Sequence, residues 1–147
     1  MKKHFTVLTR FICAICFFII IPNLTWAADY TDNGNGTISD NITSLMWQKE
    51  DTDSTYTWEA ALTYCEGLTL GSQSDWRLPN IRELESIVDE TVYNPSINST
   101  YFPNTNSWEY WSSTTHADTL VAWGVNFVNG SVDDYENAYV RCVRGGQ

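Results

Sequence analysis

Basic residues are scarce in this chain, whose 147 residues include 8 lysines and arginines against 18 aspartates and glutamates. Three of the basic residues lie within the first ten positions, before an apolar segment at residues 11–21. This segment ends at Pro22 and is too short for a membrane-spanning helix, which needs about 20 apolar residues. A basic start, a short apolar run and a small residue at Ala27 predict a secretory signal peptide at residues 1–27.

Cleavage after Ala27 leaves residues 28–147, which are enough for a single domain with one core. This part keeps five basic and all 18 acidic residues, so its net charge is −13. Such a charge repels nucleic-acid phosphates, anionic lipid headgroups and sulfated polysaccharides. We therefore expect an exported protein of the periplasm, the cell surface or the medium, with no nucleic-acid partner and no stable membrane span.

Cysteine is also sparse, because only Cys65 and Cys142 follow the signal segment. An even pair of cysteines in an exported chain indicates a disulfide bond. The alternative is a redox-active pair, which usually has the close C-x-x-C spacing that these two cysteines lack. The sequence therefore predicts a structural disulfide.

A single histidine, His116, remains after the signal segment, close to Ser112, Ser113 and Asp118. A hydrolase triad needs a histidine beside a nucleophile. No nucleophile elbow or glycine run for an oxyanion hole accompanies His116. We therefore expect an exposed loop histidine and no catalysis.

Short strands separated by turns are predicted at residues 30–48, where Asn33-Gly34 and Asn35-Gly36 tolerate a positive φ. The segment from Asp32 to Asp40 has some features of a calcium loop. With Gly36 at its sixth position, however, the carboxylates fall out of register. A β-turn is the better interpretation.

Two helices are predicted. The first has an apolar stripe at helical spacing, Trp58, Ala61, Leu62 and Cys65. Thr57 can cap this helix and Gly67 can end it. The second begins at Asn80, which can form a capping box with Glu83. Its predicted buried stripe is Ile81, Leu84, Ile87 and Val88.

Residues 91–110 show no periodicity and predict a long structured loop, which in a compact domain is usually functional. Strands are predicted at residues 111–115, 121–127 and 139–143, with an acidic connection at residues 133–136. Strands, two helices, a long loop and then antiparallel strands make an α+β order.

The segment from residue 75 to residue 80 is interpreted as a structural motif formed by Asp75, Trp76, Arg77, Pro79 and Asn80, with Leu78 between them. We expect Arg77 to bind Asp75 or loop carbonyls, while Trp76 and Leu78 fill the core. The tryptophans predicted to lie in the core are Trp47, Trp58, Trp111 and Trp123. Trp108 and Tyr110 are better placed to stack on a sugar or a peptide.

The chain resembles the C-terminal domain family of the Legionella collagen-like adhesin, across nearly all of residues 28–147. The resemblance rests on Asp32-Asn33-Gly34-Asn35-Gly36-Thr37, Leu45-Met46-Trp47-Gln48, Trp58 with Ala61 and Tyr64-Cys65, Asp75 to Asn80, Tyr101-Phe102, Trp111-Ser112-Ser113-Thr114, and Tyr139-Val140-Arg141-Cys142-Val143-Arg144. It implies a C-type-lectin-like fold, with two helices, short antiparallel sheets, a long loop region and one disulfide. In such folds the termini pair as strands and a disulfide ties the first helix to the last strand.

Membership of this family implies a binding module, because the adhesin attaches bacteria to sulfated polysaccharide. This chain lacks a collagen-like region, and its charge of −13 opposes a polyanionic ligand. It also lacks the Glu-Pro-Asn, Gln-Pro-Asp and Trp-Asn-Asp tripeptides with which calcium-dependent lectins bind sugars. Calcium-mediated sugar binding of that kind is therefore not expected.

An enzyme is the alternative, because formylglycine-generating oxidases have a similar core and a stretch like Arg77-Leu78-Pro79. Those oxidases use a reactive cysteine pair, whereas both cysteines here are assigned to the predicted disulfide. A purely structural envelope protein is a further alternative. The favoured interpretation is a non-catalytic adhesion or binding module that recognises a carbohydrate or a protein.

The resemblance implies that the long loop and the strand after it form the ligand site. The candidate ligand-binding residues are Asn104, Asn106, Trp108, Glu109, Asn126, Asp133 and Asp134. Amide and carboxylate oxygens suit either sugar hydroxyls or a hard cation. No cofactor is expected, although Asp133, Asp134 and Glu136 could hold calcium together with loop carbonyls.

Overall fold

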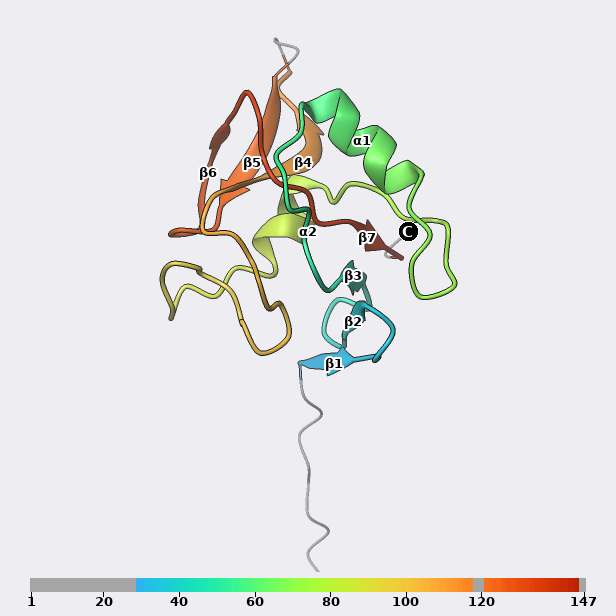
Figure 1. Cartoon of the computed structure of the whole chain (residues 1–147). Coiled ribbons are helices and arrows are strands. Elements are labelled where there is room, and N and C mark those ends of the chain that lie inside the picture. Colours follow the sequence, from blue (N-terminus) through green and yellow to red (C-terminus); the bar gives the residue numbers. More distant parts are fainter. Residues whose placement is uncertain (1–28, 118–120, 146–147) are drawn as a thin grey trace, which may run out of the picture.

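The computed structural model describes residues 29–117 and 121–145, so the predicted signal segment and Asp118 lie outside the described residues. Two sheets and two helices confirm the α+β class (Figure 1). In chain order the elements are β1 (Tyr30–Asp32), β2 (Thr37–Asp40), β3 (Met46–Gln48), α1 (Trp58–Glu66), α2 (Ile81–Glu85), β4 (Glu109–Thr115), β5 (Ala122–Asn126), β6 (Ser131–Asp134) and β7 (Val143–Arg144).

The first sheet brings both ends of the described chain together in the order β1-β2-β3-β7, with every neighbouring pair antiparallel. Trp47 of β3 lies opposite Ile38 on one side and Val143 on the other, and all three are buried. Gly34 and Gly36 have φ of 71° and 84°, as the predicted turn between the first two strands requires. The last strand is shorter than predicted, because regular pairing covers only Val143 and Arg144.

The second sheet has the order β4-β5-β6 and is also antiparallel. A turn at Asn129-Gly130 joins its last two strands, and Gly130 has a φ of 77°. The acidic segment predicted as a connection is wrong in part, because Asp133 and Asp134 belong to β6 and pair with β5. The sequence does not reveal β6, because all four of its residues are exposed and do not alternate between apolar and polar as in a half-buried strand.

α1 confirms the first predicted helix and buries Ala61 and Cys65. Thr57 occupies the N-cap position, but its side chain makes no capping hydrogen bond, so that part of the prediction is wrong. Cys65 and Cys142 are disulfide-bonded and fully buried, which confirms the structural bridge. The bond ties α1 to the residue just before β7.

α2 begins with the predicted capping box, in which Asn80 Oδ1 accepts from the backbone of Glu83 at 2.9 Å and Glu83 accepts from the backbone of Asn80 at 2.8 Å. The helix ends at Glu85, earlier than the apolar stripe predicts. The hydroxyl of Ser86 donates to the carbonyl of Glu83 at 2.6 Å and satisfies a carbonyl at the helix end. Ile87 and Val88 therefore reach the core from a turn.

The motif at residues 75–80 has a different carboxylate partner from the one predicted. The predicted carbonyl contacts are present, because the guanidinium of Arg77 donates to the carbonyls of Leu78 at 3.4 Å and Gly145 at 2.9 Å. The guanidinium of Arg77 binds both carboxylate oxygens of Glu83 at 2.7 Å, whereas Asp75 binds the guanidinium of Arg144 at 2.7 and 3.0 Å. The backbone of Arg77 also exchanges two hydrogen bonds of 2.9 Å with Val143. As predicted, Trp76 and Leu78 are buried in the core.

The core consists of two clusters of buried side chains. One lies between the first sheet, α2 and the second sheet, and includes Trp47, Leu84, Phe102, Tyr110 and Phe127. The other surrounds the disulfide and includes Ala61, Trp76, Trp111, Val140 and Cys142. Among the described residues, no helix is long and apolar enough to cross a membrane.

Candidate functional site

The long loop predicted at residues 91–110 is present, but it ends at residue 108, because Glu109 and Tyr110 already belong to β4. The backbone of the loop is fastened to the segment after β5: Ser96 N donates to the carbonyl of Phe127 at 2.7 Å, and Asn94 N donates to the carbonyl of Val128 at 3.1 Å. Phe127 N in turn donates to the carbonyl of Trp108 at 2.9 Å. Three backbone bonds therefore fix an irregular segment against the second sheet.

A buried polar cluster, here called the Arg141 cluster, anchors the far end of the loop and consists of Asp51, Thr105, Tyr110 and Arg141. The guanidinium of Arg141 is fully buried and donates to the hydroxyl of Thr105 at 2.8 Å. It also donates to the carbonyls of residues 48 and 49 and lies 3.8 Å from a carboxylate oxygen of Asp51. The hydroxyl of Tyr110 donates to the same carboxylate oxygen.

The electrostatics of the Arg141 cluster follow from its burial. Burial lowers the pKa of Arg141 and raises the pKa of Tyr110. The side chain of Asp51 is only 3% exposed, so water screens its attraction for Arg141 very little.

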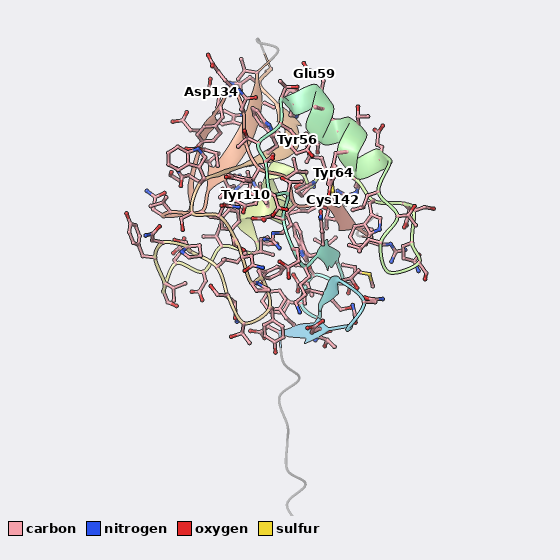
Figure 2. All side chains as sticks on the ribbon, in the orientation of Figure 1. Tyr56, Glu59, Tyr64, Tyr110, Asp134 and Cys142 are labelled. Atoms are coloured by element: carbon pink, nitrogen blue, oxygen red, sulfur yellow. A yellow bond between two sulfur atoms is a disulfide. The ribbon has the colours of Figure 1, made fainter. Side chains whose placement is uncertain are left out.

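Figure 2 shows Tyr110 in the middle of the molecule. The expectation that Tyr110 stacks on a ligand is therefore wrong, because its ring is in the core and its hydroxyl is bonded there.

The seven predicted ligand residues fall into three groups. Asn104 and Asn106 face the chain before α1: the side chain of Asn104 donates to Glu50 at 2.8 Å, and the backbone of Asn106 donates to Asp51 at 3.1 Å. These two asparagines thus help to hold the loop in place.

Trp108, Glu109 and Asn126 form the second group, at the start of β4. Glu109 lies opposite Asn126 in the sheet, and the amide of Asn126 donates to its carboxylate at 3.1 Å. The indole of Trp108 is 55% exposed. This group alone combines an exposed aromatic ring with adjacent polar side chains.

Asp133 and Asp134 form the third group and lie exposed on β6. They pair with Gly124 and Trp123, two and three positions along β5 from Asn126. Among the described residues, no three acidic, histidine or cysteine side chains gather as a possible metal site. Asp133, Asp134 and Glu136 therefore do not form the calcium-binding set considered from the sequence.

A hollow of about 490 Å³ lies within the loop and was not predicted. Its lining consists of Asp89, Val92, Tyr93, Asn94, Pro95, Ile97, Asn98, Ser99 and Thr100. Tyr93 beside it is 69% exposed and Val92 is 44% exposed. Polar side chains with an aromatic ring at the rim suit a ligand that has both hydroxyl or amide groups and an apolar face. Tyr93 within a polar segment was the available sequence signal.

His116 lies at the end of β4 and is half-buried rather than exposed. Its ring stacks on Trp123, with the ring centroids 3.8 Å apart and the planes at 15°. The nearby hydroxyl of Ser112 donates to the carbonyl of Trp123 at 2.7 Å. Trp123 was predicted to lie in the core, but it is only half-buried and lines a surface hollow together with α2.

Comparison with protein-family models matches residues 36–144 to the Lcl C-terminal domain. The match spans every strand except β1, both helices, the disulfide and the long loop. A comparison with curated proteins found no match. The family indicates a bacterial surface-associated domain. By the extent of this match, the chain belongs to the Lcl C-terminal domain family.

Proposed function

We propose that this chain is an exported, non-catalytic binding module of the bacterial cell envelope, with a C-type-lectin-like scaffold that recognises a carbohydrate or a protein through its long loop. The surface proposed for binding is called the loop surface and consists of Val92, Tyr93, Trp108 and the hollow of about 490 Å³. Membership of the Lcl C-terminal domain family supports a role at the bacterial surface.

One observation carries the proposal: exposed apolar side chains concentrate in the loop. Among the described residues, the exposed large hydrophobic side chains are Ile42, Val92, Tyr93, Trp108 and Val132. Three of these five belong to a loop with no regular structure of its own, where burial would normally be needed to offset the entropy of ordering. Exposed aromatic rings on a fixed backbone are typical of binding surfaces.

A non-catalytic role is supported by the state of the cysteines. Within residues 29–117 and 121–145, the two cysteines are bonded to each other and have no exposed surface. The oxidase alternative needs reactive thiols, which a buried disulfide does not supply. Turnover that appears when the disulfide is reduced to two thiols would favour that alternative.

The proposal is tested by capture on a glycan array and from bacterial envelope extract. The variant carries Tyr93→Ala and Trp108→Ala, whose side chains are exposed, so we expect its circular dichroism and melting temperature to match those of the wild type. Binding should weaken about tenfold or more, which corresponds to at least about 1.4 kcal/mol.

The matched control is Ile42→Ala, because Ile42 is 73% exposed but lies in the turn between β2 and β3. We expect this variant to bind like the wild type. Equal binding by the double variant and the wild type would disprove recognition through the loop surface. Equal losses in both variants would point to non-specific hydrophobic capture.

A further inference from the structure

The outer strand edge of the second sheet is open. β6 is the outer strand of the order β4-β5-β6, and within the described part of the chain it pairs only with β5 (Figure 1). All four of its residues are exposed. An exposed edge presents backbone donors and acceptors to which another extended segment can add as a strand.

A hollow of about 240 Å³ lies beside this edge, between the second sheet and α2. The sheet contributes Thr114, Trp123 and Val132 to the lining, and α2 contributes Ile81, Arg82 and Glu85. Val132 of β6 is exposed and pairs with Val125 of β5, whose side chain is in the core. Paired residues point to the same face, so Val132 lies on the face of the sheet that packs on the core. The hollow therefore lies on this face, next to the strand edge.

The charge of β6 determines what can pair with it. Asp133 and Asp134 are exposed on the strand, and Tyr135 follows them. Burial, and then the carboxylates of Glu109, Asp133 and Asp134, raise the pKa of Tyr135 to about 12. Arg82 at the rim of the hollow is paired with Glu85 at 3.0 Å, so its charge is locally balanced. The edge therefore repels a second copy of itself and attracts a basic strand.

We propose that β6 accepts an extended, basic peptide segment as a fourth strand of the second sheet, with one apolar side chain of that peptide in the hollow lined by Trp123 and Val132. Backbone hydrogen bonds give the peptide its direction along the edge, and alternate side chains then have distinct roles. Asp133 pairs with Gly124 on the face away from the hollow, so basic side chains on that face of the peptide meet it. Asp134 pairs with Trp123 on the face of the hollow, where apolar side chains of the peptide reach the hollow and a basic one meets Asp134.

An acidic edge strand also prevents aggregation, and this role alone would explain Asp133 and Asp134. It does not explain why an exposed valine borders a hollow that contains a half-buried tryptophan. A strand that only deters pairing gains nothing from an apolar recess beside it. The combination of an open edge, an apolar recess and acidic side chains matches a basic partner.

The test uses isotope-labelled full-length protein and a short synthetic peptide that alternates lysine with valine. We expect saturable shifts in the NMR signals of the β6 amides and of the Trp123 indole. Two matched peptides serve as controls: one replaces lysine with glutamate, and one carries methyl groups on alternate backbone nitrogens. Neither should bind, because the first has the wrong charge and the second cannot pair as a strand.

Asp133→Lys combined with Asp134→Lys should weaken peptide binding about tenfold or more, and added salt should weaken binding to the wild type. Glu66→Lys changes an exposed carboxylate at the end of α1 and should leave the affinity unchanged. The Tyr93→Ala and Trp108→Ala variant should also bind the peptide normally, so failure of the loop surface and failure of the strand edge are separate results. Binding of the methylated or glutamate peptide, shifts located elsewhere, or dimerisation through β6 would overturn the proposal.

Discussion

The motif at residues 75–80 and the long loop, which follows α2 and ends at residue 108, both lack regular structure, yet they are held in different ways. The motif is held by two partly exposed ion pairs, Arg77 with Glu83 and Asp75 with Arg144. The loop is fixed by the Arg141 cluster, whose two charged members have side chains at most 3% exposed. Exposed ion pairs contribute little to stability, whereas a buried charge that loses its partner is costly.

This difference separates two tasks. The motif joins the start of α2 to β7. Several contacts of modest energy are enough to hold it in place. The loop carries the exposed side chains proposed for binding, while its buried Ile97 and Phe102 pack in the core. Besides these apolar contacts, the end of the loop is held by a few buried polar groups that come from distant parts of the chain.

Removing the disulfide should have the largest effect and should act on both regions equally. Cys65 and Cys142 are 77 residues apart and enclose the motif and the loop. On the chain-entropy model, replacing both by alanine lowers the free energy of unfolding by roughly 4 kcal/mol. Denaturation in guanidinium measures this loss, with amide exchange to show whether both regions weaken together. Selective weakening of the loop would show that the motif is stable without the bridge.

Asp51→Asn should break the loop selectively. The change leaves the buried Arg141 without its carboxylate, at a cost of about 3 kcal/mol. We expect amide exchange to rise at Asn106, whose backbone donates to Asp51, before it rises in α2. Asp53→Asn is the control, because Asp53 is exposed. A loss below about 1 kcal/mol would refute the assigned role of the Arg141 cluster.

Glu83→Gln should weaken the motif by about 1 kcal/mol, because glutamine can keep the capping box but loses the charged pair with Arg77. Burial alone would raise the pKa of Glu83, but hydrogen bonds from Arg77 and from the backbone of Asn80 outweigh it and lower the pKa. A lowered folded pKa adds stability above the unfolded value of about 4.3, and this stability is lost as the pH falls through the folded value.

The melting temperatures of the wild type and Glu83→Gln should therefore differ at neutral pH and converge below about pH 4. Arg82→Gln is the control, because Arg82 is in the same helix but its side chain is 87% exposed. A difference that persists unchanged to low pH would mean that the charge of Glu83 contributes nothing.

The sequence predicts the features that depend on neighbouring residues. The capping box of Asn80 and Glu83 needs only a spacing of three, and the disulfide needs only an even pair of cysteines in an exported chain. Both predictions are confirmed. The helix stripe is correct for Leu84 and Ile87, which are buried, whereas Ile81 and Val88 are only half-buried. Its predicted length is wrong, because a serine hydroxyl can end a helix without a glycine.

The sequence does not predict contacts that only the tertiary fold creates. Tyr110 lies in a polar, aromatic-rich segment and has the pattern of a surface residue. It is buried because Asp51 and Arg141, at distant positions, meet its hydroxyl and ring in the core. For the same reason the carboxylate partner of Arg77 was predicted wrongly: the nearby Asp75 binds Arg144, which is 69 residues away.

Asp75→Asn should have the smallest effect. Asp75 forms a two-fold hydrogen bond with Arg144, and this bond lowers the pKa of Asp75, but 63% of its side chain is exposed. Water and salt screen such a pair, so we expect a melting temperature equal to that of the wild type at physiological ionic strength, with a difference only at low salt. Arg144→Gln is the matched change on the other partner. A drop in melting temperature as large as that of Glu83→Gln would mean that the number of hydrogen bonds, rather than burial, determines how firmly each region is held.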